Sequence, residues 1–95
     1  MRITKEIADY LKNKILEIHP ESKVYLFGSR VDDQAKGGDI DILILSVNKL
    51  KFNEISKIRT GFFKKFGEQK IDLVNFTFDD QHPFKDLALN NAIEL

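Results

Sequence analysis

Three aspartates and a glycine–serine pair are the residues of this 95-residue chain whose types and spacing suggest chemistry. Asp39 and Asp41 stand two positions apart at the start of an apolar run. In a β-strand their carboxylates would point to the same face, with Cα atoms about 6.6 Å apart. Two carboxylates so close repel each other, and a divalent cation relieves that repulsion. Oxygen ligands of this kind suit Mg²⁺, so the pair predicts a magnesium site.

A third acid and a phosphate-binding turn complete the pattern. Asp72 is the second residue of the next apolar run, 71–76. If the two runs form neighbouring strands, three carboxylates converge, and two Mg²⁺ ions roughly 4 Å apart can activate an attacking oxygen and stabilise a leaving phosphate. Gly28 ends a short β-favouring run and lets the backbone approach a phosphate, while Ser29 offers its hydroxyl and N–H. A helical turn after Ser29 would add favourable dipoles for a triphosphate.

Each piece also has an ordinary structural interpretation. The first two aspartates could be a solvated strand start, Asp72 could be a charge that protects a sheet edge, and the glycine–serine pair could be a simple turn. Arg30 could touch phosphate or pair with a neighbouring acid such as Asp32 or Asp33. The combination of all the pieces favours the magnesium–nucleotide site.

The apolar periodicity changes repeatedly between helical and strand-like spacing, which predicts alternating elements. The expected order is a helix at about 4–19 capped by Thr4, a strand at 24–27, a loop at 31–38, a strand at 40–47, a helix at 52–66 ended by Gly67, a strand at 71–76 and a helix at about 83–93. The fold class is therefore α/β (α+β): a small mixed sheet of about three strands with helices packed on it, in a single domain spanning residues 1–95.

Two details of these helices matter later. In the last one, Asp79 or Asp80 is the expected cap, and Phe84, Leu87, Ala88 and Ile93 are the candidates for its buried side. In the middle one, the consecutive Phe62 and Phe63 cannot both point inward, so one of them could belong to an interface. The six cations around that helix indicate either a solvated face or a docking surface for an acidic partner or an RNA.

Composition excludes several classes of protein. There is no cysteine, which excludes disulfides, thiolate metal sites and cysteine catalysis. Fifteen basic and fifteen acidic residues give zero net charge, which does not favour a general nucleic-acid binder. The sequence contains neither an apolar run long enough to span a membrane nor a signal-peptide pattern, so a cytoplasmic protein without a membrane partner is expected.

The full pattern resembles the signature of the nucleotidyltransferase superfamily, which shares the catalytic, palm-like fold of DNA polymerase β. The resemblance rests on Gly28-Ser29, nine intervening residues, Asp39-Ile40-Asp41 and the later Asp72. The short length and the sequence Gly-Ser-Arg are similar to the minimal nucleotidyltransferases (MNT), which are commonly encoded next to a HEPN-domain protein in toxin–antitoxin pairs. Gly38 stands where a serine often precedes the first acid, which is a small departure.

The resemblance implies roles for these residues. The three aspartates would bind two Mg²⁺ ions, and Asp72 would also act as base toward the acceptor hydroxyl. Gly28, Ser29 and Arg30 would hold the triphosphate of ATP. The implied activity is transfer of AMP from ATP to a hydroxyl, such as a tyrosine of a partner HEPN toxin, by an antitoxin. The alternatives are a non-catalytic antitoxin that neutralises the toxin by complex formation, and a nucleotidyltransferase for a small molecule or an RNA end.

Overall fold

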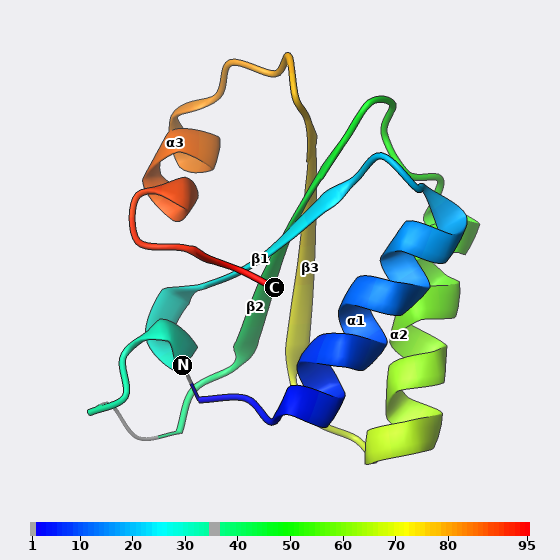
Figure 1. Ribbon diagram of the computed structural model, residues 1–95, viewed down its shortest axis with the longest axis vertical. Helices are drawn as coiled ribbons and strands as arrows, with labels where there is room; N and C mark the ends of the chain where they lie inside the picture. Colours follow the sequence, from blue (N-terminus) through cyan, green and yellow to red (C-terminus); the bar gives the residue numbers. More distant parts are fainter. Residues whose placement is uncertain (1, 35–36) are drawn as a thin grey trace.

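The computed structural model of the chain describes residues 2–34 and 37–95. The elements, in chain order, are α1 (Lys5–Ile18), β1 (Lys23–Phe27), the 3₁₀ turn η1 (Gly28–Val31), β2 (Ile40–Ser46), α2 (Phe52–Phe66), β3 (Ile71–Thr77), α3 (Pro83–Leu89) and β4 (Ile93–Glu94). The strands form one mixed sheet in the order β3-β2-β1-β4; β2 and β3 run parallel, whereas β1 pairs antiparallel with β2 and with β4. Figure 1 shows α1 and α2 together on one side of the sheet and α3 on the other.

Capping residues set the start of α1 and the end of α2. The Thr4 side chain accepts a hydrogen bond from the Ile7 N–H at 3.1 Å and caps α1, as predicted. Gly67 ends α2 with φ of 82°, a conformation that glycine adopts without strain. The helices approach closely at Gly61, where a Cβ would overlap the Tyr10 hydroxyl. A glycine that weakens the helix therefore allows the two helices to pack. None of the described helices is both long and apolar enough to cross a lipid bilayer.

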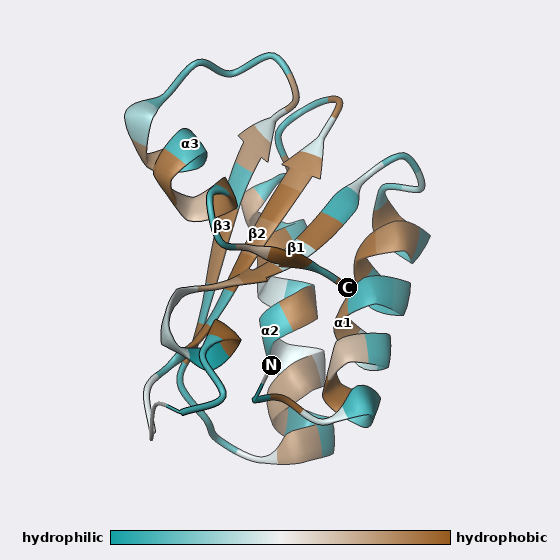
Figure 2. Ribbon diagram, turned by 60° about the vertical axis from the view of Figure 1, so that its left-hand side comes forward, coloured by the Kyte–Doolittle hydropathy of each residue, from teal (hydrophilic) through white to brown (hydrophobic). Residues whose placement is uncertain are grey.

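Strand β2 is buried on both faces and divides the core in two. Ile40, Ile42 and Ile44 belong to the cluster beneath α1 and α2, while Leu43 and Leu45 belong to the cluster beneath α3. Figure 2 shows the resulting apolar strands between more polar helix surfaces. Each fully buried side chain of this size contributes about 1.5–3 kcal/mol. Because side chains alternate along a strand, the odd-numbered residues of β2 face α3.

The C-terminal region differs from the sequence prediction. The last helix ends at Leu89 rather than at Ile93, and Ile93 instead lies in β4 opposite Leu26. The physical reason is twofold: Asn90 and the following asparagine favour turns over helix, and the free edge of β1 offers unpaired backbone groups. The Leu95 N–H donates to the Val24 carbonyl at 2.8 Å, which extends that pairing. The sheet therefore has four strands instead of about three.

The cap and the buried side of α3 also differ from expectation. His82, rather than Asp79 or Asp80, caps the helix: its Nδ1 accepts from the Phe84 N–H at 3.0 Å. Ala88 is buried as expected, but Leu87 is 71% exposed. Lys85 takes the second buried position.

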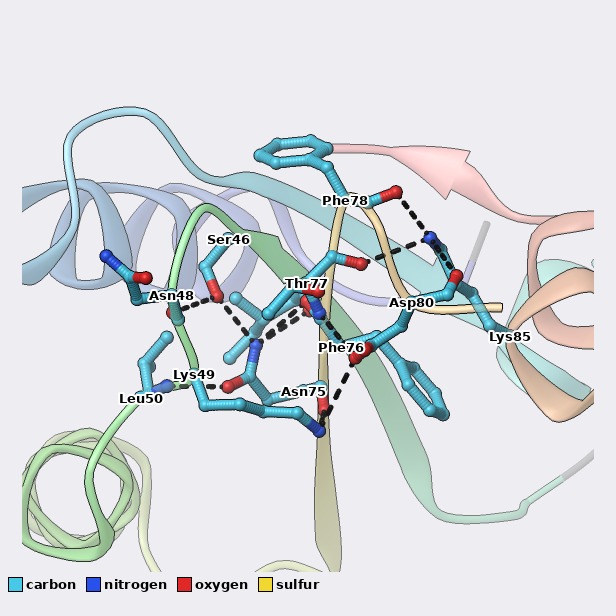
Figure 3. A network of polar contacts seen from close by, with 11 residues as sticks. Ser46, Asn48, Lys49, Leu50, Asn75, Phe76, Thr77, Phe78, Asp80 and Lys85 are labelled. Atoms are coloured by element: carbon cyan, nitrogen blue, oxygen red, sulfur yellow. Dashed lines mark hydrogen bonds and ion pairs between the residues drawn. The ribbon is translucent and has the colours of Figure 1, made fainter. Parts of the chain in front are cut away.

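Lys85 is buried because the turn before α3 supplies acceptors for its ammonium. The side chain is only 8% exposed, and its Nζ donates to the carbonyls of Thr77, Phe78 and Asp80 at 3.1, 2.8 and 2.8 Å (Figure 3). These bonds replace the water that the charge loses on burial. Apolar periodicity alone assigns this position to the surface, so it could not identify the contact.

Asn75 fastens the end of the sheet where β2 and β3 finish (Figure 3). Its amide oxygen accepts from the Leu50 N–H at 2.7 Å, and its amide nitrogen donates to the Ile44 carbonyl and the Ser46 hydroxyl, each at 3.0 Å. The Ser46 hydroxyl in turn donates to the Asn48 carbonyl at 2.7 Å. One side chain thus joins β3, β2 and the connection that leads to α2.

We predict that Asn75→Leu lowers the free energy of unfolding by about 2–3 kcal/mol, because polar groups of the buried residues Ile44, Ser46 and Leu50 lose their partner. The melting temperature should fall by about 10 °C or more. Asn91→Leu, the same substitution at an exposed turn, is the matched control and should change it little. Equal melting temperatures for the two variants in thermal denaturation would contradict the role of this network.

Candidate active site

The parallel register of β2 and β3 sets two carboxylates side by side. Asp41 and Asp72 are direct partners in that pairing, so their side chains share the sheet face that carries α3. Asp39 immediately precedes β2 and lies two residues before Asp41. All three are at the end of the sheet where β2 and β3 begin, the lower end in Figure 1. The structure therefore brings the predicted acids to the same end of the sheet.

The carboxyl group of Asp41 is the electrostatic centre of this edge. Burial raises the pKa of Asp41 above its ordinary value, the neighbouring charge of Asp72 and a side-chain hydrogen bond to it raise the pKa further, and the charge of Asp39 adds to the effect. Across the described ranges 2–34 and 37–95, the ion pairs shown are His19–Glu54 and Lys49–Asp80, and neither includes one of these acids. The site holds negative charge that no side-chain cation of the described residues neutralises by direct pairing.

Gly28 lies directly against this acid pair. The residue follows β1, has φ of 76°, and a Cβ at this position would overlap the Asp41 Oδ2. Any other residue would have to adopt a strained conformation and displace the carboxylate. The turn η1 begins here and runs through Ser29, close to the helical turn expected after Ser29. The backbone that could approach a phosphate is thus in contact with the carboxylate that could approach a metal ion.

Ser29 lies directly against Gly38, the residue before Asp39. A Cβ on Gly38 would overlap the Ser29 hydroxyl, and Gly38 has φ of 88°. A serine at position 38 would therefore not fit this arrangement, although the sequence comparison treats the glycine as a small departure. Gly38 allows Ser29 to lie close to the strand start that carries Asp39.

Two arginines organise the same loop through backbone carbonyls. Arg30 donates from Nε and Nη2 to the Gly38 carbonyl at 3.2 and 3.1 Å, and from Nη1 to the Arg2 carbonyl at 2.9 Å. The Arg2 guanidinium donates to the carbonyls of Ser29, Asp32 and Gly37 at 3.0, 2.8 and 2.9 Å. Together they fix the turn from both sides. The predicted phosphate contact of Arg30 stays a prediction, whereas its structural contact to Gly38 is observed.

The acid cluster can be tested for its fit to Mg²⁺. Within residues 2–34 and 37–95, no group of three histidine, cysteine, aspartate or glutamate side chains is close enough to form a ready metal site. Asp41 and Asp72 nevertheless form an adjacent pair whose repulsion raises the pKa of Asp41. Mg²⁺ in nucleotide enzymes is typically held by one or two carboxylates together with water and substrate phosphates. The pair therefore fits a metal ion that arrives with a nucleotide.

A cavity of about 550 Å³ opens beside these acids. Its lining includes Asp39, Asp72 and Phe63, together with the segment 68–71 that joins α2 to β3. Phe62 is fully buried, whereas Phe63 is half-buried, so the two phenylalanines do point in different directions as expected from helix geometry. We call this the Phe63 cavity.

Sequence reasoning found the acids and the glycine–serine turn but missed two features of the site. Arg2 lies 27 positions from Ser29, which it contacts, and a lone arginine near the start of a chain has no pattern that predicts such a contact. The sequence indicated that Phe62 and Phe63 cannot both point inward but not which of them turns away; in the structure Phe63 packs against the margin of the core and also lines the cavity. Both depend on tertiary proximity that spacing alone does not encode.

Comparisons with known proteins agree with this geometry. Residues 5–95 match the family described as polymerase beta, nucleotidyltransferase. No curated protein sequence matches the chain at a significant level. One similar solved structure contains a tri-AMPylated HEPN toxin of Shewanella oneidensis in complex with MNT antitoxin, with 16% sequence identity and a TM-score of 0.68; the match covers 97% of this chain and 71% of the other.

A second similar structure is a mutant of the toxin–antitoxin pair MntA–HpeT with two aspartate-to-glutamate substitutions. It has 16% identity and a TM-score of 0.68, and the match covers 92% of this chain and 70% of the other. At this identity the structural matches establish the fold. The family match spans nearly the whole chain, and it shows that this protein belongs to the polymerase β nucleotidyltransferase family.

Proposed function

We propose that this protein is a Mg²⁺-dependent nucleotidyltransferase of the cytoplasm that transfers AMP from ATP to a tyrosine hydroxyl of a partner HEPN toxin, and that it acts as an antitoxin. The observation that carries the proposal is the in-register pairing of Asp41 with Asp72 beside a glycine turn that touches the same carboxylate. Family membership supports the class of reaction. The choice of AMP and of a protein acceptor is supported by the AMPylated toxin in one similar complex.

The residues of the site are assigned to the two substrates, the nucleotide and the acceptor hydroxyl. Gly28 and Ser29 are proposed to bind the triphosphate through backbone N–H groups and the serine hydroxyl. Asp39, Asp41 and Asp72 are proposed to hold Mg²⁺, which, when bound, would neutralise charge on the phosphates and make the acceptor oxygen a better nucleophile. Asp72, on the edge strand β3, is the acid proposed to take the proton of the acceptor hydroxyl.

A non-catalytic antitoxin is the main alternative, and one observation favours it. Leu87 is 71% exposed and Phe78 and Phe84 are each 39% exposed, at and just before α3. Apolar surface of this kind is typical of protein contacts. Complex formation through α3 would not need the acids. A transferase for a small molecule or an RNA end is a further alternative; the zero net charge does not favour nucleic acid as the main partner.

We predict that replacing Asp39 and Asp41 together by asparagine reduces AMP transfer to the partner at least about a hundredfold, because even outer-shell changes at metal sites cost roughly 10–100-fold. The measurement is mass spectrometry of the HEPN partner after incubation with Mg²⁺ and ATP. Transfer that persists in the double variant would rule out these acids as catalytic. Full toxin neutralisation without transfer would favour complex formation, and labelling of an RNA end or a small molecule alone would favour the third class.

The raised pKa of Asp41 makes a separate prediction about stability. Because the pKa of Asp41 is higher in the folded state, folding favours its protonated carboxyl group. The stabilisation that this group gives is lost as pH rises from the ordinary pKa of 3.8 through the raised pKa. Above the raised pKa, the charged carboxylate destabilises the fold. Asp41→Asn should therefore stabilise the protein at pH 7 by less than about 1 kcal/mol, since solvent screens a partly exposed group. The gain should vanish below pH 3.8. The measurement is thermal denaturation at pH 7 and at the acidic pH, with Asp79→Asn, at an exposed aspartate, as the control variant. A stabilisation by Asp41→Asn that does not depend on pH would contradict its origin in the raised pKa.

The loop contacts of Arg2 give a third prediction. Arg2→Gln removes the guanidinium that holds three carbonyls of the loop, so the dissociation constant for a magnesium-bound ATP analogue should rise about tenfold, equivalent to about 1.4 kcal/mol. Isothermal titration calorimetry measures it. Arg59→Gln, on α2, is the control and should bind as the wild type does. If both variants bind equally well, the loop does not depend on Arg2.

A further inference from the structure

A cavity between α1 and α2 is lined by positive charge and has a volume of about 330 Å³. We call it the lysine cavity; its lining residues are Lys14 of α1 and Ser56, Lys57, Thr60, Gly61 and Lys64 of α2. Figure 1 shows both helices on one side of the sheet and α3 on the other, and Asp41 and Asp72 share the face that carries α3. The lysine cavity is therefore separate from the candidate active site.

Helical spacing turns the polar lining residues of α2 to one side. Ser56, Thr60 and Lys64 follow one another at intervals of four residues, so they form a single row along the helix. Lys57 lies about two turns before Lys64, on the neighbouring row. Lys14 adds a third ammonium group from α1. Two helices thus contribute cations and hydroxyl groups to the same hollow.

The cations around α2 differ in the partners that they find. Lys49 pairs with Asp80 at 3.8 Å, and the Lys65 Nζ lies over two aromatic rings, 5.7 and 5.8 Å from their centroids. The ammonium groups of the lysine cavity, in contrast, make no ion pair and no hydrogen bond with any residue whose position the structure gives. Like charges that face one cavity repel each other, and a bound anion relieves that repulsion.

The chemistry of the lining favours phosphate as this anion. Lysine binds phosphate as a compact point charge, and the hydroxyl groups of Ser56 and Thr60 can donate to phosphate oxygens. Lys57 and Lys64 are separated by about 10 Å along the helix axis, so a single phosphate cannot reach both ends of the cavity as well as linked phosphates can. We propose that the lysine cavity binds an oligophosphate, an anion of two or more linked phosphate groups. The proposal does not depend on the proposed function.

Linked phosphates could come from a free small molecule or from the backbone of an RNA. Single-stranded RNA is usually held by aromatic side chains on which its bases stack, and no lining residue that the structure describes is aromatic, acidic or wholly apolar. The zero net charge also does not favour a nucleic acid. A volume of about 330 Å³ lies within the usual range of small-ligand sites. The structure therefore favours the free oligophosphate.

The test is a binding titration without a metal ion. The ¹⁵N-labelled protein, in a buffer with EDTA, is titrated with tripolyphosphate and monitored by NMR. We expect saturable shifts at Lys14 and at residues 56–64. Replacing Lys57 and Lys64 together by glutamine should weaken binding at least about tenfold, because two of the three lining charges are lost.

The matched control replaces Lys5 and Lys12 together by glutamine. These lysines are exposed, stand seven positions apart on α1 and lie outside the lining, and their loss changes the net charge equally. The control variant should bind tripolyphosphate as the wild type does. Equal weakening in the two double variants would reduce the effect to overall charge and overturn the assignment.

Other ligands supply the remaining outcomes. Shifts of the same size with sulfate at equal ionic strength would mean an adventitious ion only, and shifts confined to the glycine–serine turn would place the phosphate elsewhere. Tighter binding of an oligouridine or of polyglutamate at residues 56–64 would assign the cavity to RNA or to an acidic protein. Each of these results overturns the proposal.

Failure of the proposed function has a different signature. With Mg²⁺ and a non-hydrolysable α,β-methylene analogue of ATP, the amides around Gly28, Asp41 and Asp72 would then not shift, whatever tripolyphosphate does at α2. In turn, the Asp39→Asn, Asp41→Asn double variant should bind tripolyphosphate at residues 56–64 as tightly as the wild type does, because these acids do not line the lysine cavity.

Discussion

The parallel register between β2 and β3 is the constraint on which the site depends. It places Asp41 opposite Asp72 although the two charges repel, and a slip of one residue would turn one of these acids to the opposite face. The apolar partners that follow in the same register, Ile42 with Leu73 and Leu43 with Val74, hold the strands together beyond the acids. Asn75 fixes the far end of the pair through its bonds to β2. Burial and hydrogen bonding thus offset the repulsion between the two acids.

Residues 28–34 and 37–38 lie against the acids that this register places. Gly28 touches one carboxylate and Gly38 touches the serine of the turn, and in both places a Cβ would collide. The guanidinium groups of Arg2 and Arg30 hold the loop by its carbonyl oxygens. The result is a row across the end of the sheet: the glycine–serine turn, the acid pair and the Phe63 cavity.

Much of this could be predicted from local pattern. Short-range signals, namely the alternation along β2, the Thr4 cap and the Gly67 stop, were enough to predict the α/β fold. The positions of the three acids at the starts of two apolar runs placed them correctly at the same end of the sheet. What sequence could not supply depends on contacts between distant segments. Strand β4 forms because β1 has a free edge, and Lys85 is buried because a preceding turn presents carbonyls. The Phe63 cavity likewise exists only once α2 lies beside the start of β3.

The most direct test of the central claim is to locate a bound metal ion with the nucleotide present. Mn²⁺ can replace Mg²⁺, and its unpaired electrons broaden the NMR signals of nearby amides. With the α,β-methylene ATP analogue, the account predicts broadening centred on Gly28, Asp41 and Asp72, and much weaker broadening with Mn²⁺ alone, since the acid pair has to share the ion with phosphates. Broadening centred elsewhere, or unchanged by the nucleotide, would contradict a shared metal–phosphate site at this edge of the sheet.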